Sequence, residues 1–481
     1  MWWSNAVIYQ VYVRSFQDSD GDGVGDLPGA TRRLEHVAEL GASAVWLSPI
    51  YPSPNADYGY DVTDFQAVEP TFGTLADLDR LIARAHELGL RVILDFVPCH
   101  TSIEHRWFRA HPEYYVWSDT VPNNWRAAFG GGAWGHDPVT GRYFLHSFFP
   151  EQADLDWHEP EVRRRIAEAL AFWVARGVDG FRLDALDRIM KDERLRDDPP
   201  ATEPPPFPMT PEDAKLDHVH SRNAPDVGVA LQAIRAAVGS AFLVGEVYLR
   251  TSEMGPYLEA LDEVFSFDAM HSGPDARRLA KAIAAGVARG QTGWVLSNHD
   301  FSRLPTRAGP GNARACVMLL LFLPGPVFMF QGDELGMGDA VPAGEPLDRN
   351  ARDGFRMPMR WDTSEHAGFS STTPWLRSDG SQVPAAVEQS ADPGSMLSLV
   401  KRALTLRASL GQDRRDARVI ESPPDTVVVA RGDRLAAINL GDEPRPAPVA
   451  GTRLVLEARP GDGGDLSVIP PHGGWIATAA S

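Results

Sequence analysis

The chain has 481 residues, and its 46 Lys and Arg residues against 65 Asp and Glu residues give a formal net charge of −19 at pH 7. That length exceeds one ordinary domain and suits a single large α/β barrel with an appendage, or two to three domains. With 43% hydrophobic and 23% charged residues, the composition is that of a globular protein and argues against wholesale disorder. The acidic balance argues against a nucleic acid or an anionic membrane as partner, because its field repels phosphates, and it favours a neutral or cationic small molecule.

The two cysteines, Cys99 and Cys316, form no paired motif, which leaves a disulfide-stapled or structural-zinc protein without support. The first residues lack the basic region of a secretory signal. The most apolar stretch, Cys316–Phe330, is interrupted by Pro and Gly and is too short to span a bilayer. We therefore expect a cytoplasmic protein, a monomer or homodimer, with no membrane partner and no nucleic-acid partner.

Short apolar runs typical of buried strands alternate with amphipathic helical stretches over about the first 400 residues. In residues 75–88, for example, Leu78, Leu81, Ile82 and Ala85 share one face of a helix. Alternation repeated eight times predicts a (β/α)8 TIM barrel, an α/β fold, with a doubly wound open sheet as the alternative. The eight candidate strands are Ala6–Val13, Ala44–Leu47, Val92–Val97, Gly180–Asp184, Phe242–Glu246, Val264–Asp268, Trp294–Ser297 and Val327–Phe330.

Three segments depart from this alternation. Residues 101–157 are rich in aromatics, Gly and Pro and predict an inserted subdomain, whereas the proline-rich residues 199–206 predict a rigid loop over the barrel mouth. From residue 401 to 481, a helix gives way to short strand-like runs between Asp, Gly and Pro turns, which predicts a C-terminal antiparallel β domain. The expected division is a catalytic barrel of residues 1–100 and 158–400, the insertion at 101–157 and the β domain at 401–481.

Polar side chains gather where the candidate barrel strands end, which is where TIM barrels form their sites. Because each carboxylate follows an apolar run, each should be partly buried and needs a partner or a role. Three acids with an arginine and two histidines in one mouth indicate a metal cluster, an acid/base pair or a structural ion network. The residues concerned are His100, Arg182, Asp184, Glu246, His299 and Asp300.

A separate acidic run lies near the start of the chain, at residues 18–26. Its oxygens at relative positions 1, 3, 5, 7 and 9, with Gly at position 6, follow a spacing that wraps a hard cation. The bidentate Glu at position 12 of an EF-hand is missing, since Gly29 stands there, and the alternative is an acidic surface turn. The candidate ligands are Asp18, Asp20, Asp22, the Val24 carbonyl and Asp26.

Several strand-end motifs resemble the signature regions of the α-amylase family of glycoside hydrolases, and most closely its α-glucosidase and oligo-1,6-glucosidase branch. The likeness extends over nearly the whole chain, because further motifs match in the same order. The matching runs are VIYQVYVRSF at 7–16, DYGYD at 57–61, DFVPCH at 95–100, GFRLDA at 180–185, GEV at 245–247, SNHD at 297–300, QGDELG at 331–336 and RDGFRMPMRW at 352–361.

The resemblance implies a retaining glycosidase that works by double displacement. Asp184 would be the nucleophile, Glu246 the acid and then the base, and Asp300 the third acid that binds sugar hydroxyls. Two carboxylates about 5 Å apart leave no room for a water molecule between them, so retention follows. Arg182, two residues before Asp184 on a strand, should keep that nucleophile ionised. A Glu in an apolar pocket beside other acids should have a raised pKa and be protonated when needed.

The resemblance also implies a closed pocket for one terminal glucose. In it, Asp57 would pair with Arg356 and Tyr60 would stack on the sugar, while His100 and His299 would donate to its hydroxyls. Further substrate-binding positions are Arg182, the leaving-group residue Ala185, and Phe129 and Phe148 as apolar walls, for which the core of the insertion is the alternative. Asp156 and Arg360 depart from the branch's motifs, and the second leaves the lining of the leaving-group site in doubt.

In the branch, the loop at 18–26 holds a structural Ca²⁺ or Mg²⁺, so we expect that ion and no organic cofactor. The expected activity is release of terminal α-linked glucose from short oligosaccharides or α-glucosides, with α-1,4 bonds preferred and glucosyl transfer as a side reaction. A glucosyltransferase or isomerase acting on sucrose or maltose is the main alternative. An inactive binding subunit and a metal-dependent hydrolase are weaker ones, because the acids are present and no spacing suits a two-metal site.

Overall fold

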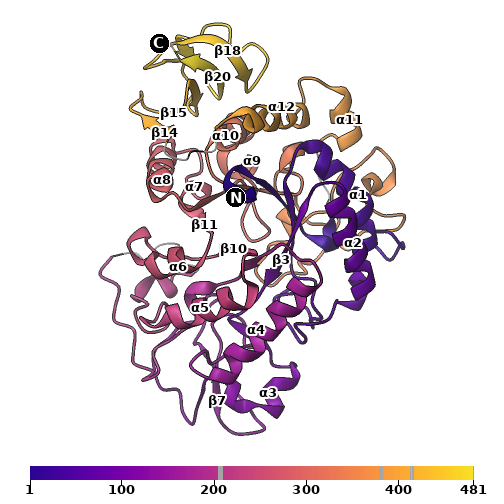
Figure 1. Ribbon diagram of the computed structural model, residues 1–481, viewed down its shortest axis with the longest axis vertical. Helices are drawn as coiled ribbons and strands as arrows, with labels where there is room; N and C mark the ends of the chain where they lie inside the picture. Colours follow the sequence, from indigo (N-terminus) through magenta and orange to yellow (C-terminus); the bar gives the residue numbers. More distant parts are fainter. Residues whose placement is uncertain (204–209, 379–382, 412, 414–415, 480–481) are drawn as a thin grey trace. The chain divides into compact units, whose positions relative to one another are not determined.

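The computed structural model describes residues 1–203, 210–378, 383–411, 413 and 416–479. Its main sheet is a closed parallel barrel with the strand order β1-β13-β12-β11-β10-β9-β3-β2, labelled in part in Figure 1. The predicted TIM barrel is confirmed, each strand lying within a few residues of its expected place. The strands are β1 (Val7–Val11), β2 (Ala44–Leu47), β3 (Arg91–Phe96), β9 (Gly180–Leu183), β10 (Phe242–Gly245), β11 (Glu263–Ser266), β12 (Thr292–Val295) and β13 (Val327–Phe330).

The sixth barrel strand ends earlier than expected. The apolar run continues through Phe267, but the backbone leaves the extended conformation at Ser266 and enters a short helix, α7 (Phe267–Met270). Asp268 therefore lies on a helix and not on a strand. A continuous apolar run does not distinguish a buried strand from the buried helix that follows it.

The helices that alternate with the strands carry the expected start and stop signals. Asp26 begins α1 by accepting a hydrogen bond from the Gly29 N–H, and Gly41, at φ 101°, ends it. The helices are α1 (Leu27–Leu40), α2 (Leu75–Glu87), α3 (Arg106–Ala110), α4 (Pro160–Ala175), α5 (Val227–Val238), α6 (Gly255–Ala260), α7, α8 (Ala276–Arg289), α9 (Leu304–Ala308), α10 (Pro310–Phe322), α11 (Ala386–Ala391) and α12 (Met396–Ser409). In the described part of the chain, no helix is both long and apolar enough to cross a membrane.

The segment after β3 forms two small antiparallel sheets. One pairs β4 (His100–Ser102) with β8 (Gln152–Asp154), and the other has the order β5-β7-β6, formed by Trp117–Ser118, Tyr143–Leu145 and Trp134–His136. In the proline-rich segment after β9, the Asp217 N–H donates to the Pro199 carbonyl. Residues 204–206 of that segment lie outside the described residues. The expected boundaries of the three domains stay a prediction.

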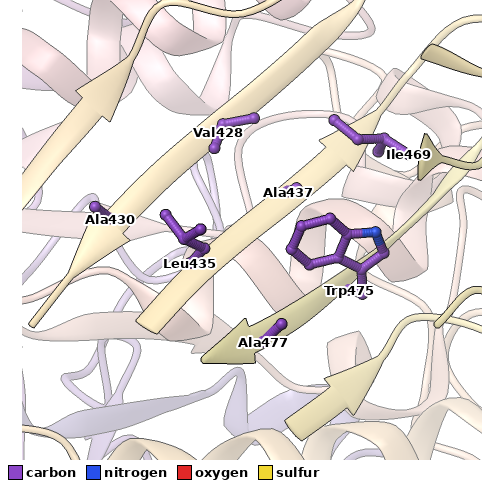
Figure 2. Packing of buried hydrophobic residues seen from close by; sticks show 7 residues of the cluster. All are labelled: Val428, Ala430, Leu435, Ala437, Ile469, Trp475 and Ala477. Carbon is purple, nitrogen blue, oxygen red and sulfur yellow. The ribbon is translucent and has the colours of Figure 1, made fainter. Parts of the chain in front are cut away.

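The C-terminal part is an antiparallel sheet with the order β14-β15-β16-β20-β18. Figure 2 shows Trp475 among apolar side chains of neighbouring strands, including Leu435, Ala437 and Ile469. The strands here are β14 (Ala417–Ile420), β15 (Thr426–Arg431), β16 (Arg434–Asn439), β17 (Arg445–Pro446), β18 (Gly451–Glu457), β19 (Val468–Ile469) and β20 (Gly473–Ala479).

The chain divides into two compact units. The first comprises Met1–Trp46, Ala83–Arg91 and Phe265–Ser481, and the second comprises Leu47–Ile82 and Val92–Val264. Residues of the predicted site fall into both units.

Candidate active site

Three neighbouring strands of the second unit place the candidate catalytic carboxylates side by side. Asp95 on β3 pairs in register with Arg182 on β9, and the first residue after β9 is Asp184. Its N–H donates to the Phe96 carbonyl, and the N–H of Glu246, the first residue after β10, donates to the Leu183 carbonyl. Each carboxylate therefore continues a barrel strand, at the strand end where TIM barrels carry their active sites.

The guanidinium of Arg182 binds all three of these carboxylates. Its Nη1 lies 2.8 Å from Asp95 Oδ1 and 2.6 Å from Asp184 Oδ1, and its Nη2 lies 2.8 Å from Glu246 Oε2. The Arg182 side chain is 1% exposed. Burial alone would lower its pKa, but the charges of Asp95 and Glu246 outweigh burial and raise the pKa well above its usual value. Arg182 is thus a permanent positive charge between the carboxylates.

Asp95 was not among the predicted site residues, although it lies in the same strand-end motif as His100. Burial raises the pKa of Asp95 and the charge of Glu246 adds to this effect, while Arg182 opposes it. Its second oxygen, Oδ2, accepts a hydrogen bond of 3.0 Å from the Tyr60 hydroxyl. Asp95 therefore links Tyr60 to the guanidinium, and the Tyr60 ring lies 5.8 Å from the guanidinium carbon.

The surroundings of Glu246 are more polar than the apolar pocket expected from sequence. Oε2 accepts from Arg182 and, at 3.3 Å, from the Ala185 N–H, while Oε1 accepts from the Tyr248 hydroxyl at 3.0 Å. Ala185 is buried and has φ 45° and ψ 43°, a left-handed conformation that is uncommon for a residue with a side chain. This turn directs the Ala185 N–H toward the Glu246 carboxylate. Because its φ is positive, the position after Asp184 is under backbone strain.

A second group in the same unit joins the predicted sugar-binding residues Asp57, Tyr60 and His100. The side-chain amide of Gln152, on β8, donates to Asp57 Oδ2 at 3.0 Å and lies 3.0 Å from His100 Nε2. His100 Nε2 also lies 3.1 Å from the Tyr60 carbonyl oxygen. Burial lowers the pKa of His100, which favours a neutral imidazole. Gln152 is not among the site residues predicted from the sequence.

The two phenylalanines predicted as apolar walls pack against each other, with ring centroids 5.4 Å apart. Phe148 also lies 5.2 Å from the His100 ring and 5.5 Å from the Arg188 guanidinium carbon. Both phenylalanines are half-buried. The contact with His100 brings Phe148 to the predicted sugar-binding residues, whereas Phe129 also packs on Phe149 at 4.6 Å.

The first unit carries the remaining predicted residues, His299, Asp300 and Arg356. His299 is fully buried, its Nε2 lies 3.1 Å from Asp300 Oδ2, and its Nδ1 lies 2.8 Å from the Gln10 amide nitrogen. Asp300 Oδ1 is 3.2 Å from Arg356 Nη2 and 3.1 Å from Arg352 Nη1.

Arg356 is held between two carboxylates of its own unit. Besides Asp300, it binds Asp348 through Nη1 at 3.0 Å, and its Nε donates to the His299 carbonyl at 2.8 Å. Arg352 belongs to the matching run at 352–361 but is not among the predicted site residues. Asp348 precedes that run in a segment without a periodic pattern, so nothing in the sequence pointed to it. The expected pairing of Arg356 with Asp57 stays a prediction.

In the acidic run at 18–26, three of the four predicted carboxylate ligands lie together, while the Val24 carbonyl stays a predicted ligand. Asp18, Asp20 and Asp22 each offer one oxygen within 4.8 Å of the others, so these residues fit a hard cation. Asp26 instead accepts from the N–H groups of Gly29 and Ser19, and the Val24 N–H donates to Asp22. Burial raises the pKa of Asp18, but hydrogen bonds from the Ser370 hydroxyl and from backbone N–H groups outweigh it and lower that pKa.

Comparison with known proteins agrees with this arrangement. The sequence model of the family described as "Alpha amylase, catalytic domain" matches residues 10–412. A probable alpha-glucosidase of Rhizobium meliloti (strain 1021) is 40% identical, over 84% of this chain and 82% of its own length. An oligo-1,6-glucosidase of Parageobacillus thermoglucosidasius is 34% identical, over 85% of this chain and 84% of its own.

Solved structures give the same picture. The crystal structure of an alpha-glucosyl transfer enzyme, XgtA, superposes with a TM-score of 0.89 at 34% identity and covers 100% of this chain and 99% of its own. The trehalulose synthase MutB from Pseudomonas mesoacidophila MX-45 has a TM-score of 0.87 at 27% identity, with 100% of both chains covered. Hydrolases and glucosyl-transferring enzymes thus share this architecture.

Proposed function

Since this chain belongs to the α-amylase family of glycoside hydrolases, we propose that it is a retaining, exo-acting α-glucosidase. Its substrates would be short oligosaccharides or α-glucosides, from which it releases terminal α-linked glucose. One observation carries the proposal: adjacent nitrogens of the Arg182 guanidinium bind Asp184 and Glu246 at 2.6 and 2.8 Å. Sharing one guanidinium keeps the two carboxylates close, which favours retention over inversion.

In the proposed reaction, the Asp184 carboxylate attacks the anomeric carbon and forms a β-linked glycosyl-enzyme. Glu246 transfers its proton to the departing glycosidic oxygen, so that the leaving sugar departs neutral. A water molecule then gives a proton to Glu246 and attacks the same carbon, releasing α-glucose and restoring the Asp184 carboxylate. Arg182 stays positively charged throughout and favours the ionised nucleophile.

Exo-action is supported by the buried group around Gln152. Asp57 is 4% exposed and His100 is 1% exposed; Asp57 accepts from the Gln152 amide, and His100 Nε2 lies against the Tyr60 carbonyl oxygen. Such a group suits the hydroxyls of one terminal sugar, because buried polar atoms without a matching ligand are costly. In the first unit, Asp300 and His299 would bind sugar hydroxyls, a role that rests on the family resemblance.

The bond preference would depend on Ala185, the residue after the nucleophile. A small side chain there leaves room for an α-1,4-linked leaving sugar, whose ring presses against that wall, whereas an α-1,6 link adds a rotatable CH₂ group. We therefore expect α-1,4 bonds to be cleaved faster than α-1,6 bonds.

A second candidate function is glucosyl transfer or isomerisation of sucrose or maltose. The likeness to an alpha-glucosyl transfer enzyme and to a trehalulose synthase favours it, because the same glycosyl-enzyme reacts with a sugar hydroxyl in place of water.

For the loop at 18–26, we propose a structural Ca²⁺ or Mg²⁺ held by Asp18, Asp20 and Asp22, which when bound would supply positive charge to that turn.

The test is a panel of maltose, isomaltose, sucrose, trehalose and p-nitrophenyl α-glucoside, with the anomer of the first product followed by NMR. Release of α-glucose from maltose is the expected result. β-Glucose as the first product would contradict retention, and sucrose isomers as the main products would favour the second candidate.

A further inference from the structure

Tyr248 lies two residues after Glu246, and its hydroxyl contacts that carboxyl group directly. The hydroxyl donates to Glu246 Oε1 at 3.0 Å, and the Tyr248 N–H donates to Asp187 Oδ1 at 3.5 Å. The side chain is half-buried. The tyrosine is therefore tied to the turn after β9 through its backbone and to the proposed acid through its ring.

The two oxygens of Glu246 have different partners, and this decides where a proton can sit. Oε2 faces two donors, Arg182 Nη2 at 2.8 Å and the Ala185 N–H at 3.3 Å. Neither a guanidinium nor a backbone N–H can accept a hydrogen bond. A proton on Oε2 would point at donors, so the acid form of Glu246 carries its proton on Oε1.

A tyrosine hydroxyl is matched to Oε1 because it can both donate and accept. When Glu246 is ionised, the hydroxyl donates to Oε1. When Glu246 is protonated, the hydroxyl rotates and accepts from Oε1. Arg182, in contrast, stabilises only the ionised form. A group that is an acid in one step and a base in the next needs a partner for both states.

We propose that Tyr248 is a positioning residue of the acid/base step, which assigns the transferable proton to Glu246 Oε1 and supports both protonation states there. The inference rests on the proposed function. In the first step, the proton passes from Oε1 to the glycosidic oxygen as the bond to the anomeric carbon breaks. In the second step, a proton of the attacking water returns to Oε1, and the Tyr248 hydroxyl keeps its own proton throughout.

The charged groups around Glu246 determine what a pH profile reports. Arg182 is permanently charged, while Asp95 and Asp184 share its guanidinium and Asp187 accepts from the Tyr248 backbone. The contacts of Asp95 with Arg182 and Tyr60 do not involve the Tyr248 hydroxyl. Removing that hydroxyl should therefore move the titration of Glu246 and leave the contacts of the other carboxylates in place.

The experiment uses Tyr248→Phe, with Tyr257→Phe as the matched control. The Tyr257 hydroxyl donates to Asn223 at 3.1 Å, so that variant also removes one tyrosine hydroxyl from the second unit. The hydroxyl stabilises the ionised carboxylate more than the neutral acid, because a hydrogen bond to a charged group is the stronger one. Its loss should therefore raise the pKa of Glu246 in Tyr248→Phe by about one unit. The alkaline limb of kcat/KM should move up with it, and the control should keep the wild-type profile.

Leaving-group dependence gives a second readout. We expect Tyr248→Phe to lose about tenfold in kcat/KM on maltose and much less on p-nitrophenyl α-glucoside, whose leaving group needs little protonation. Equal losses on both substrates with an unmoved alkaline limb would overturn the inference, because they indicate a structural role alone.

Direct titration of Glu246 separates this inference from the proposed function. Carbon-13 NMR of labelled glutamate carboxyls, assigned with Glu246→Gln, measures the pKa without turnover. A raised pKa in Tyr248→Phe, in a protein that releases no glucose, would sink the proposed function and keep the link between the two residues. If the wild type releases glucose but the pKa of Glu246 is unchanged in Tyr248→Phe, the proposed function stands and the inference about Tyr248 fails.

Discussion

Two buried clusters of the second unit place a cation between carboxylates, and they differ in the kind of cation. In the Arg182 cluster, defined by Arg182, Asp95, Asp184 and Glu246, the cation is a guanidinium. The His218 cluster consists of His218, Asp198 and Asp213. There, His218 Nδ1 lies 3.4 Å from Asp198 Oδ2 and Nε2 lies 3.0 Å from Asp213 Oδ1.

The two clusters differ in whether pH changes the charge of the cation. Burial lowers the pKa of His218, but hydrogen bonds to Asp198 and Asp213 outweigh burial and raise it, so this cation is lost at high pH. Arg182 keeps its charge at every pH at which the protein is folded. The Arg182 cluster belongs to the ends of barrel strands and the His218 cluster to the irregular segment between β9 and α5. A constant field suits chemistry, whereas a titratable cation makes the stability of its segment depend on pH.

The strongest test of this distinction is Asp184→Asn, for which we expect turnover on maltose to fall by several orders of magnitude. A neutral amide cannot form the covalent intermediate. The fold should persist, because Arg182 retains Asp95 and Glu246 as partners. Steady-state kinetics and a thermal melt of the purified variant measure both effects.

Asp198→Asn is the control in the other cluster, since it makes the same chemical change to a carboxylate beside a buried cation. It should lower stability while kcat stays within a few-fold of wild type. Near-wild-type turnover in Asp184→Asn would contradict the assignment of Asp184 as nucleophile. The Arg182 cluster would then no longer differ from the His218 cluster in function.

The sequence predicted the barrel because buried strands are short apolar runs, and each run lies within a few residues of a strand. It also predicted that Arg182, Asp184 and Glu246 lie together, since strand ends converge in such a barrel. Tyr248 and Gln152 were missed because their roles depend on side-chain contacts that leave no periodic pattern. The His218 cluster was missed for the same reason, as its members come from an irregular segment.

The next prediction concerns Ala185, the residue that follows the proposed nucleophile. We expect Ala185→Val to narrow or reverse the preference for maltose over isomaltose, because two added methyl groups occupy the leaving-group side. The ratio of kcat/KM on maltose to that on isomaltose should fall by about 10- to 200-fold. The positive φ of Ala185 adds a cost of about 1–3 kcal/mol for a β-branched residue, so stability should fall as well.

The ratio of kcat/KM on the two disaccharides measures the effect and is independent of how much enzyme is folded. Ala185→Gly is the matched variant, because glycine accepts the left-handed conformation without strain. It should keep the maltose preference and the stability. A clear isomaltose preference in the wild type would show that Ala185 is not the determinant.

For the titratable cluster, we expect His218→Gln to lower the free energy of unfolding by about 3 kcal/mol at pH 5.5, because it leaves two buried carboxylates without their cation. The folded pKa of His218 is raised, so its contribution is fully present below about pH 6.5 and is lost as pH rises through the folded value. The gap between wild type and variant should therefore shrink above pH 6.5. Urea unfolding at a series of pH values measures it.

The acidic side of the same stability profile reports on Asp213, the partner of His218. Burial raises the pKa of Asp213, but the hydrogen bond from His218 and the charge of Arg188 lower it to about 2. Its contribution is present above the usual Asp pKa of about 4 and is lost as pH falls toward 2. A gap between wild type and His218→Gln that stays constant from pH 5 to 9 would contradict a titrating His218.

The smallest expected effect lies in the loop at 18–26, where the carboxylates of Asp18 and Asp22 are held by backbone N–H groups. If a cation occupies the oxygens of Asp18, Asp20 and Asp22, it binds the native state, and its removal subtracts a linkage contribution from stability. We expect EDTA to lower the melting temperature by about 2–4 °C, with little change in maltase activity at 25 °C. Asp20→Asn should melt below wild type and respond less to EDTA, because it removes one exposed ligand without touching either buried cluster.

A wild-type melting temperature that EDTA leaves unchanged, and that added Ca²⁺ or Mg²⁺ does not raise, would contradict an exchangeable ion in this loop. Loss of activity in EDTA at an unchanged melting temperature would go further, since it would place a metal requirement in the chemistry that is here assigned to Asp184 and Glu246 alone.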